Sequence, residues 1–197
     1  MLTPVMGLLQ GVPVTAEARV HAVSPGTVGR IQRAALTLFL RQGYERTSLR
    51  EIADQLAFTK AALYYHYRSK EELLQAVLNP LLADLEKLVA APAVPREPFL
   101  AAYLEVLLRH RQLVQYLASD GAAVLNSELG PRLLRLRSAV EGLIVGASPS
   151  LSERMRSAAA LSALQGALSV CREEDRTDEV RATAMQVMQA ALGPDRR

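Results

Sequence analysis

The sequence predicts an all-α protein in which an N-terminal three-helix unit precedes a larger helical domain. From Val28 onward, apolar residues recur at intervals of three and four, as they do on the buried face of an amphipathic helix. No stretch alternates between apolar and polar residues as a half-buried strand does. Half of the 197 residues are hydrophobic and 22% are charged, so the chain can bury a sizeable core. We expect about nine helices in total.

Proline and glycine divide the chain into three parts. Residues 1–25 are punctuated by both and show no sustained apolar period, which predicts a mobile N-terminal arm. Residues 26–72 are predicted to form the three-helix unit. Residues 73–194 are predicted to form the second domain, because helical periodicity continues through them.

The first helix is predicted to run from Val28 to just before Gly43. Five apolar residues share one of its faces at helical spacing: Ile31, Ala34, Ala35, Leu38 and Phe39. Gly43 is expected to end this helix, because glycine readily adopts the left-handed conformation found just beyond helix ends.

Two short helices follow, each with a capping residue at its start. Ser48 and Glu51 form the pattern of a capping box, and Thr59 is placed to cap the next helix. Ser69 and Glu72 form a second capping-box pattern, which predicts the start of a fourth helix. Two short helices joined by about three residues are typical of a helix-turn-helix, in which the second helix presents its N-terminal side chains outward.

The third helix is predicted to have one buried and one exposed face. Leu63 and Tyr67 lie four residues apart and should face the core. The exposed side chains combine small residues, a cation and hydrogen-bonding aromatic groups, which suits the major groove of DNA: Lys60, Ala61, Ala62, Tyr64, Tyr65 and His66.

Beyond the third helix, further helices are predicted between breaks at proline or glycine. Their expected spans are 70–90, 98–109, 111–118, 127–145, 150–172 and 177–192. Pro80 lies inside the first of these spans, where it removes a backbone hydrogen bond. Two interpretations stay open for Pro80, a static kink and a hinge between two halves of the protein.

The net charge of +3 is concentrated in one segment of the chain. Residues 26–72 contain eight Lys and Arg against five Asp and Glu, whereas residues 73–197 contain fourteen of each sign. This excess makes the three-helix unit a candidate surface for a polyanion such as nucleic acid. An excess of this size also occurs on ordinary solvated helix faces.

Other classes of protein find little support in the sequence. Cys171 is the only cysteine, so no intrachain disulfide forms, and the three histidines are too scattered to predict a metal site. We interpret Cys171 as a small buried apolar residue. Nucleophile-elbow, Walker and HExxH motifs are absent, so we expect neither catalytic residues nor a cofactor. No apolar run reaches membrane-spanning length, and no basic segment precedes the apolar stretch 5–9, which predicts a cytoplasmic protein.

The stretch from Gly43 to Leu73, GYERTSLREIADQLAFTKAALYYHYRSKEEL, resembles the DNA-binding domain of the tetracycline-repressor (TetR) family of bacterial transcriptional regulators. The resemblance implies a two-fold homodimer that places two recognition helices in successive major grooves of a palindromic operator. It also implies a helical regulatory domain that binds a small-molecule effector and then releases the DNA. One departure is visible, since the family usually carries glycine where this chain has Ala57.

The resemblance also implies roles for individual residues. Three residues at helix starts would bind phosphates: Thr47, Ser48 and Thr59. Lys60 and Ala61 would contact base edges. Four more residues would contact the DNA backbone: Tyr64, Tyr65, His66 and Lys70. Backbone N–H groups at helix starts do bind phosphate, and lysine can donate to guanine. A surface histidine without a role is the alternative for His66.

Two further sites are predicted in the second domain. Six residues on the fifth and sixth helices combine apolar bulk with polar tips, as small-molecule sites do: Phe99, Tyr103, Leu107, His110, Tyr116 and Leu117. Ordinary core packing explains them equally well. Apolar stripes on the last two helices predict an isologous four-helix dimer interface that includes Met155, Ala159, Leu164, Leu168, Ala184 and Met188.

Three functions are consistent with these observations. The first is a ligand-responsive transcriptional regulator, specifically a repressor, that binds DNA as a homodimer. The second is a constitutive architectural DNA-binding protein without an effector, although about 120 residues after the helix-turn-helix exceed what such a module needs. The third is a helical enzyme in which the helix-turn-helix is incidental, which the missing catalytic motifs disfavour.

Overall fold

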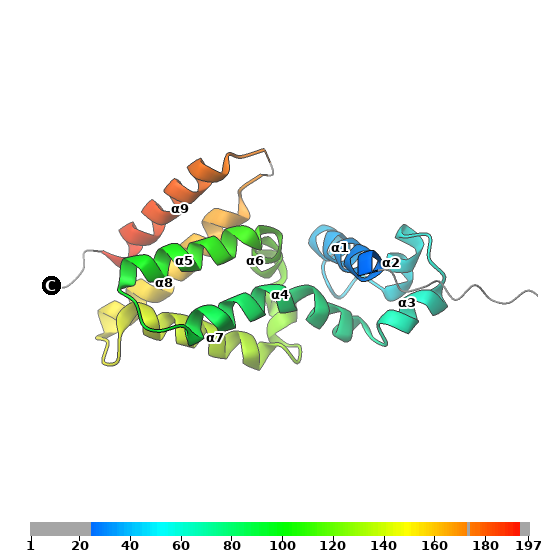
Figure 1. Ribbon diagram of the computed structural model, residues 1–197, viewed down its shortest axis with the longest axis horizontal. Coiled ribbons are helices and arrows are strands. Elements are labelled where there is room, and N and C mark those ends of the chain that lie inside the picture. The colour runs from blue at the N-terminus through cyan, green and yellow to red at the C-terminus, as the bar shows by residue number, and fades with distance from the viewer. Residues whose placement is uncertain (1–24, 173, 194–197) are drawn as a thin grey trace, which may run out of the picture.

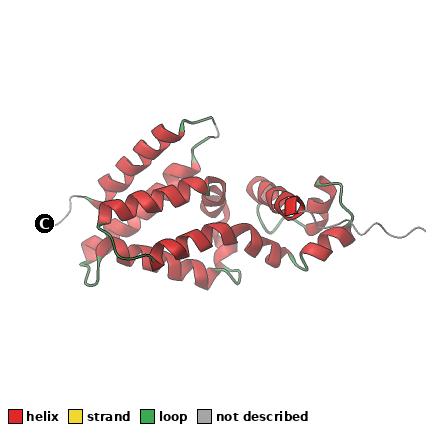
Figure 2. Ribbon diagram, viewed as in Figure 1, coloured by secondary structure: helices red, strands yellow, loops and turns green. Residues whose placement is uncertain are grey.

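The computed structural model describes residues 25–172 and 174–193, and within them it shows nine α-helices and no strand (Figures 1 and 2). The predicted all-α fold is confirmed. The predicted arm of residues 1–25 lies outside the described residues except for Pro25, which begins the first helix. The helices are α1 (Pro25–Gln42), α2 (Leu49–Gln55), α3 (Lys60–His66), α4 (Lys70–Ala90), α5 (Arg96–Arg109), α6 (Arg111–Leu125), α7 (Gly130–Val145), α8 (Leu151–Ser169) and α9 (Thr177–Leu192).

Helix α4 connects the two parts of the fold. Figure 1 shows α1, α2 and α3 at one end of the molecule and α4 running from them into the bundle of α5 to α9. Pro80 lies within α4 and is exposed, and the helix continues through it. No helix among the described residues combines the length and the apolar character that a membrane crossing requires.

The local signals in the α1–α3 unit are those the sequence predicts. All five residues of the predicted α1 stripe are buried, as are Leu63 and Tyr67. Gly43 has φ +83°, and its N–H donates to the carbonyl of Phe39. Ser48 and Glu51 form a complete capping box at the start of α2.

The second predicted capping box forms only in part. The hydroxyl of Ser69 accepts from the backbone N–H of Glu72 at 3.0 Å, as a cap does. The carboxylate of Glu72, however, accepts from the backbone N–H of Arg68 at 2.7 Å. Glu72 therefore reaches one residue beyond the cap and fixes the α3–α4 turn.

The turn between α2 and α3 contains a residue in the left-handed conformation. Ala57 has φ +54° and is the only non-glycine residue with positive φ among the described residues. A Cβ in this region crowds the following carbonyl oxygen. Ala57, which stands where the family usually has glycine, thus occupies a backbone conformation that favours glycine.

Replacing Ala57 with glycine should raise the free energy of unfolding by about 0.5–1 kcal/mol, because relief of left-handed strain exceeds the extra entropy that glycine loses on folding. Chemical denaturation measures this change. Ala102→Gly is the matched control, because Ala102 is exposed within α5, and it should lower stability by about 1 kcal/mol. Equal losses in both variants would contradict strain at Ala57.

Several predicted helix boundaries beyond α4 are wrong by a few residues. Helix α5 begins two residues early, α7 begins at Gly130 because residues 126–129 form a turn, and α8 ends at Ser169. The largest difference is in α6, which continues past Gly121 to Leu125 instead of ending at residue 118. Asp120 within α6 has non-helical angles, φ −138° and ψ 29°, so the helix bends there but does not stop.

Tyr44 lies at the junction between the α1–α3 unit and the other helices. Its backbone N–H donates to Asp120 Oδ2 on α6 at 2.7 Å, and its hydroxyl donates to Glu71 Oε2 on α4 at 3.1 Å. The other oxygen of Glu71 accepts from the backbone N–H of Glu128 in the α6–α7 turn at 3.1 Å. Burial, followed by the charge of Glu71, raises the pKa of Tyr44, so its hydroxyl stays protonated and available as a donor.

Candidate functional site

The exposed face of α3 lies opposite a set of buried apolar side chains. Leu49 and Ile52 of α2 and Leu63 of α3 are buried and fix the two helices against each other. On the outer side, Tyr65 is 74% exposed and Tyr64 is 42% exposed. This arrangement turns the outer face of α3 toward solvent.

Small and charged residues complete that face. Lys60 and Ala61 are exposed at the start of α3, while Ala62 and His66 are half-buried. The Lys60 ammonium lies 5.4 Å from the centre of the Tyr64 ring, and the ring of Tyr65 meets His66 edge-on. Small residues beside a cation leave room for the edges of base pairs and supply a donor for them.

The two helix starts are both capped by side chains. Ser48 accepts from the N–H of Glu51 at 3.2 Å, and its own N–H and hydroxyl donate to the Glu51 carboxylate at 2.7 and 2.8 Å. Hydrogen bonds from Ser48 lower the pKa of Glu51. Thr59 accepts from the N–H of Ala62 at 3.1 Å. Ser48 and Thr59 are both exposed, but at Ser48 a phosphate would meet an anion already in place.

Two residues expected to contact DNA are engaged inside the α1–α3 unit instead. Thr47 is 2% exposed and its hydroxyl donates to the carbonyl of Gly43 at 2.8 Å. The Lys70 ammonium donates to the carbonyls of Tyr44 and Glu45 at 2.8 and 3.2 Å, and it lies 4.1 Å from the centre of the Tyr44 ring. Thr47 and Lys70 therefore fix the loop before α2: the Thr47 hydroxyl is buried, and two of the three N–H donors of the Lys70 ammonium are already engaged.

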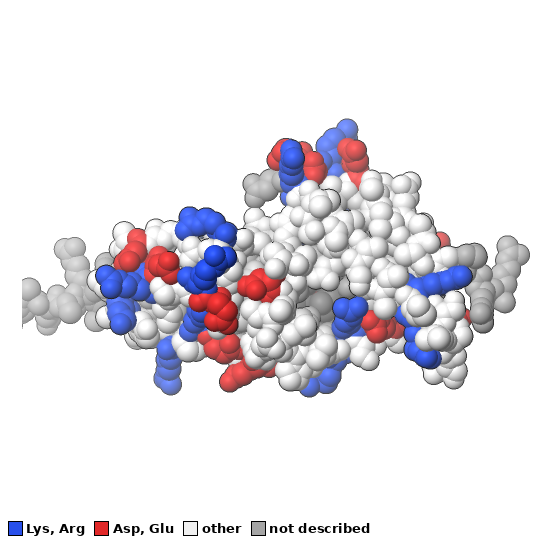
Figure 3. Space-filling view, turned by 180° about the vertical axis from the view of Figure 1, so that it is seen from behind, with Lys and Arg blue, Asp and Glu red and all other residues white. Residues whose placement is uncertain are grey.

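The charge distribution adds candidates that sequence reasoning missed. Figure 3 shows Lys and Arg side chains gathered at the end of the molecule that holds α1–α3, with acidic side chains among them. Arg50 on α2 and Arg68 after α3 are exposed there. Arg50 is 3.8 Å from Asp54, and both side chains are mostly exposed, so water screens this pair strongly. The only sequence signal for either arginine was positive charge close to the recognition helix.

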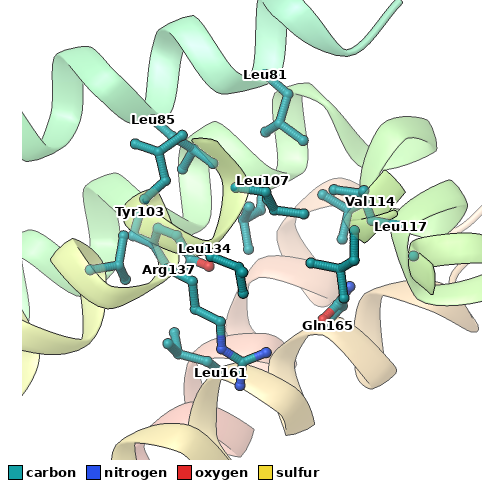
Figure 4. Close-up of a pocket in the computed structure, with 15 residues that line it drawn as sticks. Leu81, Leu85, Tyr103, Leu107, Val114, Leu117, Leu134, Arg137, Leu161 and Gln165 are labelled. Atoms are coloured by element: carbon teal, nitrogen blue, oxygen red, sulfur yellow. The ribbon is translucent and has the colours of Figure 1, made fainter. Parts of the chain in front are cut away.

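A second feature is an apolar cavity of about 240 Å³ among α4 to α8 (Figure 4). Leucine and valine side chains make up most of its wall, including Leu81, Leu85, Val114, Leu125, Leu136 and Leu161. Polar groups enter it from Tyr103, Arg137 and Gln165. An apolar enclosure with a few polar groups is the usual form of a small-molecule site.

The comparisons with known proteins agree with this geometry. Residues 31–77 match the model of the bacterial regulatory proteins of the tetR family. A transcriptional regulator from Aquifex aeolicus VF5 aligns with 82% of this chain and 96% of its own, at 25% identity and a TM-score of 0.61. Residues 31–77 therefore belong to the tetR family.

The curated relatives match less of the chain than the solved structures do. The HTH-type transcriptional repressor KstR2 of Mycolicibacterium smegmatis is 31% identical over 90 residues, which are 42% of this chain and 44% of that protein. The chain thus spans less than half the length of such curated relatives. The structure of KstR2 from Mycobacterium tuberculosis aligns with 88% of this chain and 97% of its own, at 18% identity and a TM-score of 0.66, and shares the fold.

Of the six residues predicted to form a pocket, three line the cavity: Tyr103, Leu107 and Leu117. Phe99 is buried and its ring stacks on Tyr103 at a centroid distance of 6.4 Å, outside the lining. Tyr116 is fully buried and faces Phe39 of α1, with ring centroids 5.7 Å apart. The helical period could not distinguish these directions, because α5 and α6 are apolar on more than one face.

His110 also lies away from the cavity. Its Nε2 is 3.0 Å from Asp84 Oδ2 on α4, and Arg109 and Lys87 reach the same carboxylate at 3.0 Å. Hydrogen bonds from His110, Lys87 and Arg109 hold the pKa of Asp84 well below its usual range. His110 therefore ties α5 to α4. Cys171, expected to be buried, is half-buried beside the core.

The residues predicted to form a dimer interface separate into two groups. Leu164 and Leu168 of α8 and Ala184 and Met188 of α9 are at most 2% exposed within the single chain. They are core residues of the protomer, so their assignment to a dimer interface is wrong. Met155 is 64% exposed, and Ala159 lies one turn further along the exposed face of α8.

Proposed function

We propose that this chain is a ligand-responsive transcriptional repressor that binds a palindromic DNA operator as a homodimer. Residues 26–72 form the DNA-binding domain, with α3 in the major groove. Residues 73–194 bind a small-molecule effector and a second copy of the chain. The protein acts in the cytoplasm and carries out no catalytic step. The exposed face of α3, the family match over residues 31–77 and the similarity to repressors support DNA binding.

A single observation supports the response to a ligand. Within α6, Leu117, Gly121 and Leu125 line the cavity, while Asp120 bonds to the backbone of Tyr44 in the α1–α3 unit. The same bent segment of α6 thus contacts both the cavity and the DNA-binding domain. A molecule that favours a different bend would shift the position of α1–α3, and an architectural protein needs no such connection.

Selection of bound duplexes from a random DNA pool tests the DNA-binding part of this proposal. We expect an inverted repeat whose half-sites lie about one helical turn, 10–10.5 base pairs, or a multiple of it apart, because two α3 helices related by two-fold symmetry must each reach a major groove. Recovery of no preferred sequence would contradict a repressor and favour the architectural alternative.

The exposed stripe on α8 is the surface we propose for dimerisation. Leu151 and Met155 are 63% and 64% exposed, and Ala159, Ala163 and Gly166 extend the same side of the helix with small residues. Large apolar side chains next to small ones allow a second helix to approach closely.

Met155→Glu should convert the dimer to monomers, because two-fold symmetry brings two copies of the stripe together and would bury both new carboxylates. Analytical ultracentrifugation measures the mass. Val94→Glu is the matched control, because Val94 is also exposed, at 53%, but lies between α4 and α5. A Met155→Glu protein that sediments as the wild-type dimer does would place the interface elsewhere.

A further inference from the structure

The cavity among α4 to α8 contains one cationic side chain and no acidic one. Its described lining consists of leucine, valine, glycine and tyrosine together with Arg137 and Gln165. A cationic ligand would find no partner there and would meet the guanidinium of Arg137. A highly polar ligand would leave many of its groups without hydrogen bonds, which is costly in an apolar enclosure.

Arg137 is positioned at the mouth of the cavity. Its side chain is 48% exposed, and Leu134, one turn earlier on α7, is 55% exposed although it also lines the cavity. Figure 4 shows the Arg137 side chain extending from α7 toward Leu161 on α8. A charged group bound to Arg137 would keep contact with water while the rest of the ligand lies among the leucines.

The guanidinium of Arg137 keeps N–H donors that no described group uses. Its Nε donates to Glu141 Oε1 at 3.0 Å, and among the described residues no group accepts from its two terminal nitrogens. Those nitrogens form a planar fork that matches the two oxygens of a carboxylate.

Tyr103 supplies a further donor on the inner side. Burial raises the pKa of Tyr103 to about 12, so its hydroxyl is protonated near neutral pH. Figure 4 shows the Tyr103 side chain inside the cavity, and no described group accepts from its hydroxyl.

We propose that the effector of this chain is a medium-chain monocarboxylate, with its carboxylate on the terminal nitrogens of Arg137 and its hydrocarbon chain among the leucines of α4 to α8. The proposal rests on the cavity being the effector site of the proposed function. In this arrangement Glu141 competes with the ligand for Arg137. Its carboxylate already accepts from Nε of the guanidinium, and its negative charge repels a second carboxylate.

Isothermal titration calorimetry with sodium decanoate and decanol, both below their aggregation limits, tests the ligand class. Decanoate should bind about tenfold more tightly than decanol, because only the carboxylate accepts from the guanidinium fork. Arg137→Gln should weaken decanoate binding about tenfold and leave decanol binding unchanged. Glu141→Gln should instead strengthen decanoate binding several-fold and leave decanol binding unchanged.

Arg135→Gln is the matched control, because Arg135 is an exposed arginine on the same helix that does not line the cavity. It should bind decanoate as the wild type does. Thermal melting verifies the fold of each variant, and Arg137→Lys provides a second test, since it keeps the charge but loses the fork and should bind decanoate with intermediate affinity. Equal affinity for decanoate and decanol, or decanoate binding that is unchanged in Arg137→Gln, would overturn the proposal.

A second measurement separates this proposal from the proposed function. Fluorescence anisotropy of a selected DNA duplex should show release of the protein when decanoate is added. If decanoate binds through Arg137 but the duplex stays bound, the ligand class stands and the repressor mechanism fails. If the duplex is released by neutral apolar molecules and not by decanoate, the mechanism stands and the ligand class is wrong.

Discussion

Replacing Gly130 with alanine should lower the free energy of unfolding by about 3 kcal/mol, at the upper end of the cost of overpacking. Gly130 is buried at the start of α7, and a Cβ added to it would collide with the carbonyl oxygen of Leu125 and lie 2.9 Å from its carbonyl carbon. These are backbone atoms at the end of α6. They cannot move without opening the turn in which the Gly130 N–H donates to Ser127 at 3.0 Å.

The matched control is Gly142→Ala, in the interior of the same helix. A Cβ at Gly142 would meet nothing within 4 Å, so this variant should gain about 0.5–1 kcal/mol from the higher helix propensity of alanine. Chemical denaturation of both variants measures the two changes. A Gly130→Ala protein as stable as the wild type would mean that the α6–α7 turn has another conformation in solution.

Replacing Lys60 with alanine should weaken binding to the selected duplex by about 1–3 kcal/mol and binding to a scrambled duplex much less, because a contact to base edges depends on sequence. Lys60 is exposed at the first position of α3. Fluorescence anisotropy over a salt series measures both affinities. Equal losses on the two duplexes would show that Lys60 contacts only phosphates.

Lys70→Ala provides a comparison that removes the same charge nearby. Because the Lys70 ammonium donates to the Tyr44 and Glu45 carbonyls, its loss should lower the folding stability of the protein by about 1–2 kcal/mol. The affinities for both duplexes should then fall by the same factor, because a disordered loop before α2 no longer holds α2 and α3 in place. If Lys70→Ala is as stable as the wild type but binds both duplexes more weakly, Lys70 contacts a phosphate.

Signals between near neighbours in the chain were predictable from the sequence. The Ser48 and Thr59 caps and the left-handed Gly43 each depend on residues within four positions. The α1 stripe was predictable for a related reason, since all its members face one side of one helix. The unusual backbone at Ala57 could be anticipated only because the family pattern has glycine there.

Contacts between distant segments account for what local patterns could not predict. Lys70 reaches the loop before α2 from a different helix, which no local pattern indicates. Leu164 and Met188 lie on apolar stripes of α8 and α9, and a stripe looks the same whether it packs on its own chain or on a partner. Arg137 was not predicted as a site residue, because a charged residue on a helix is usually solvated. Only the tertiary fold shows that it lies at the mouth of the cavity.

The bond between Asp120 and Tyr44 has an evolutionary consequence. Asp120 accepts from the backbone N–H of residue 44, a group that every amino acid except proline provides. The DNA-binding part can therefore change its side chains to read a new operator without losing this link to α6. A chimera that carries the first three helices of a relative should keep it, provided that position 44 is not proline.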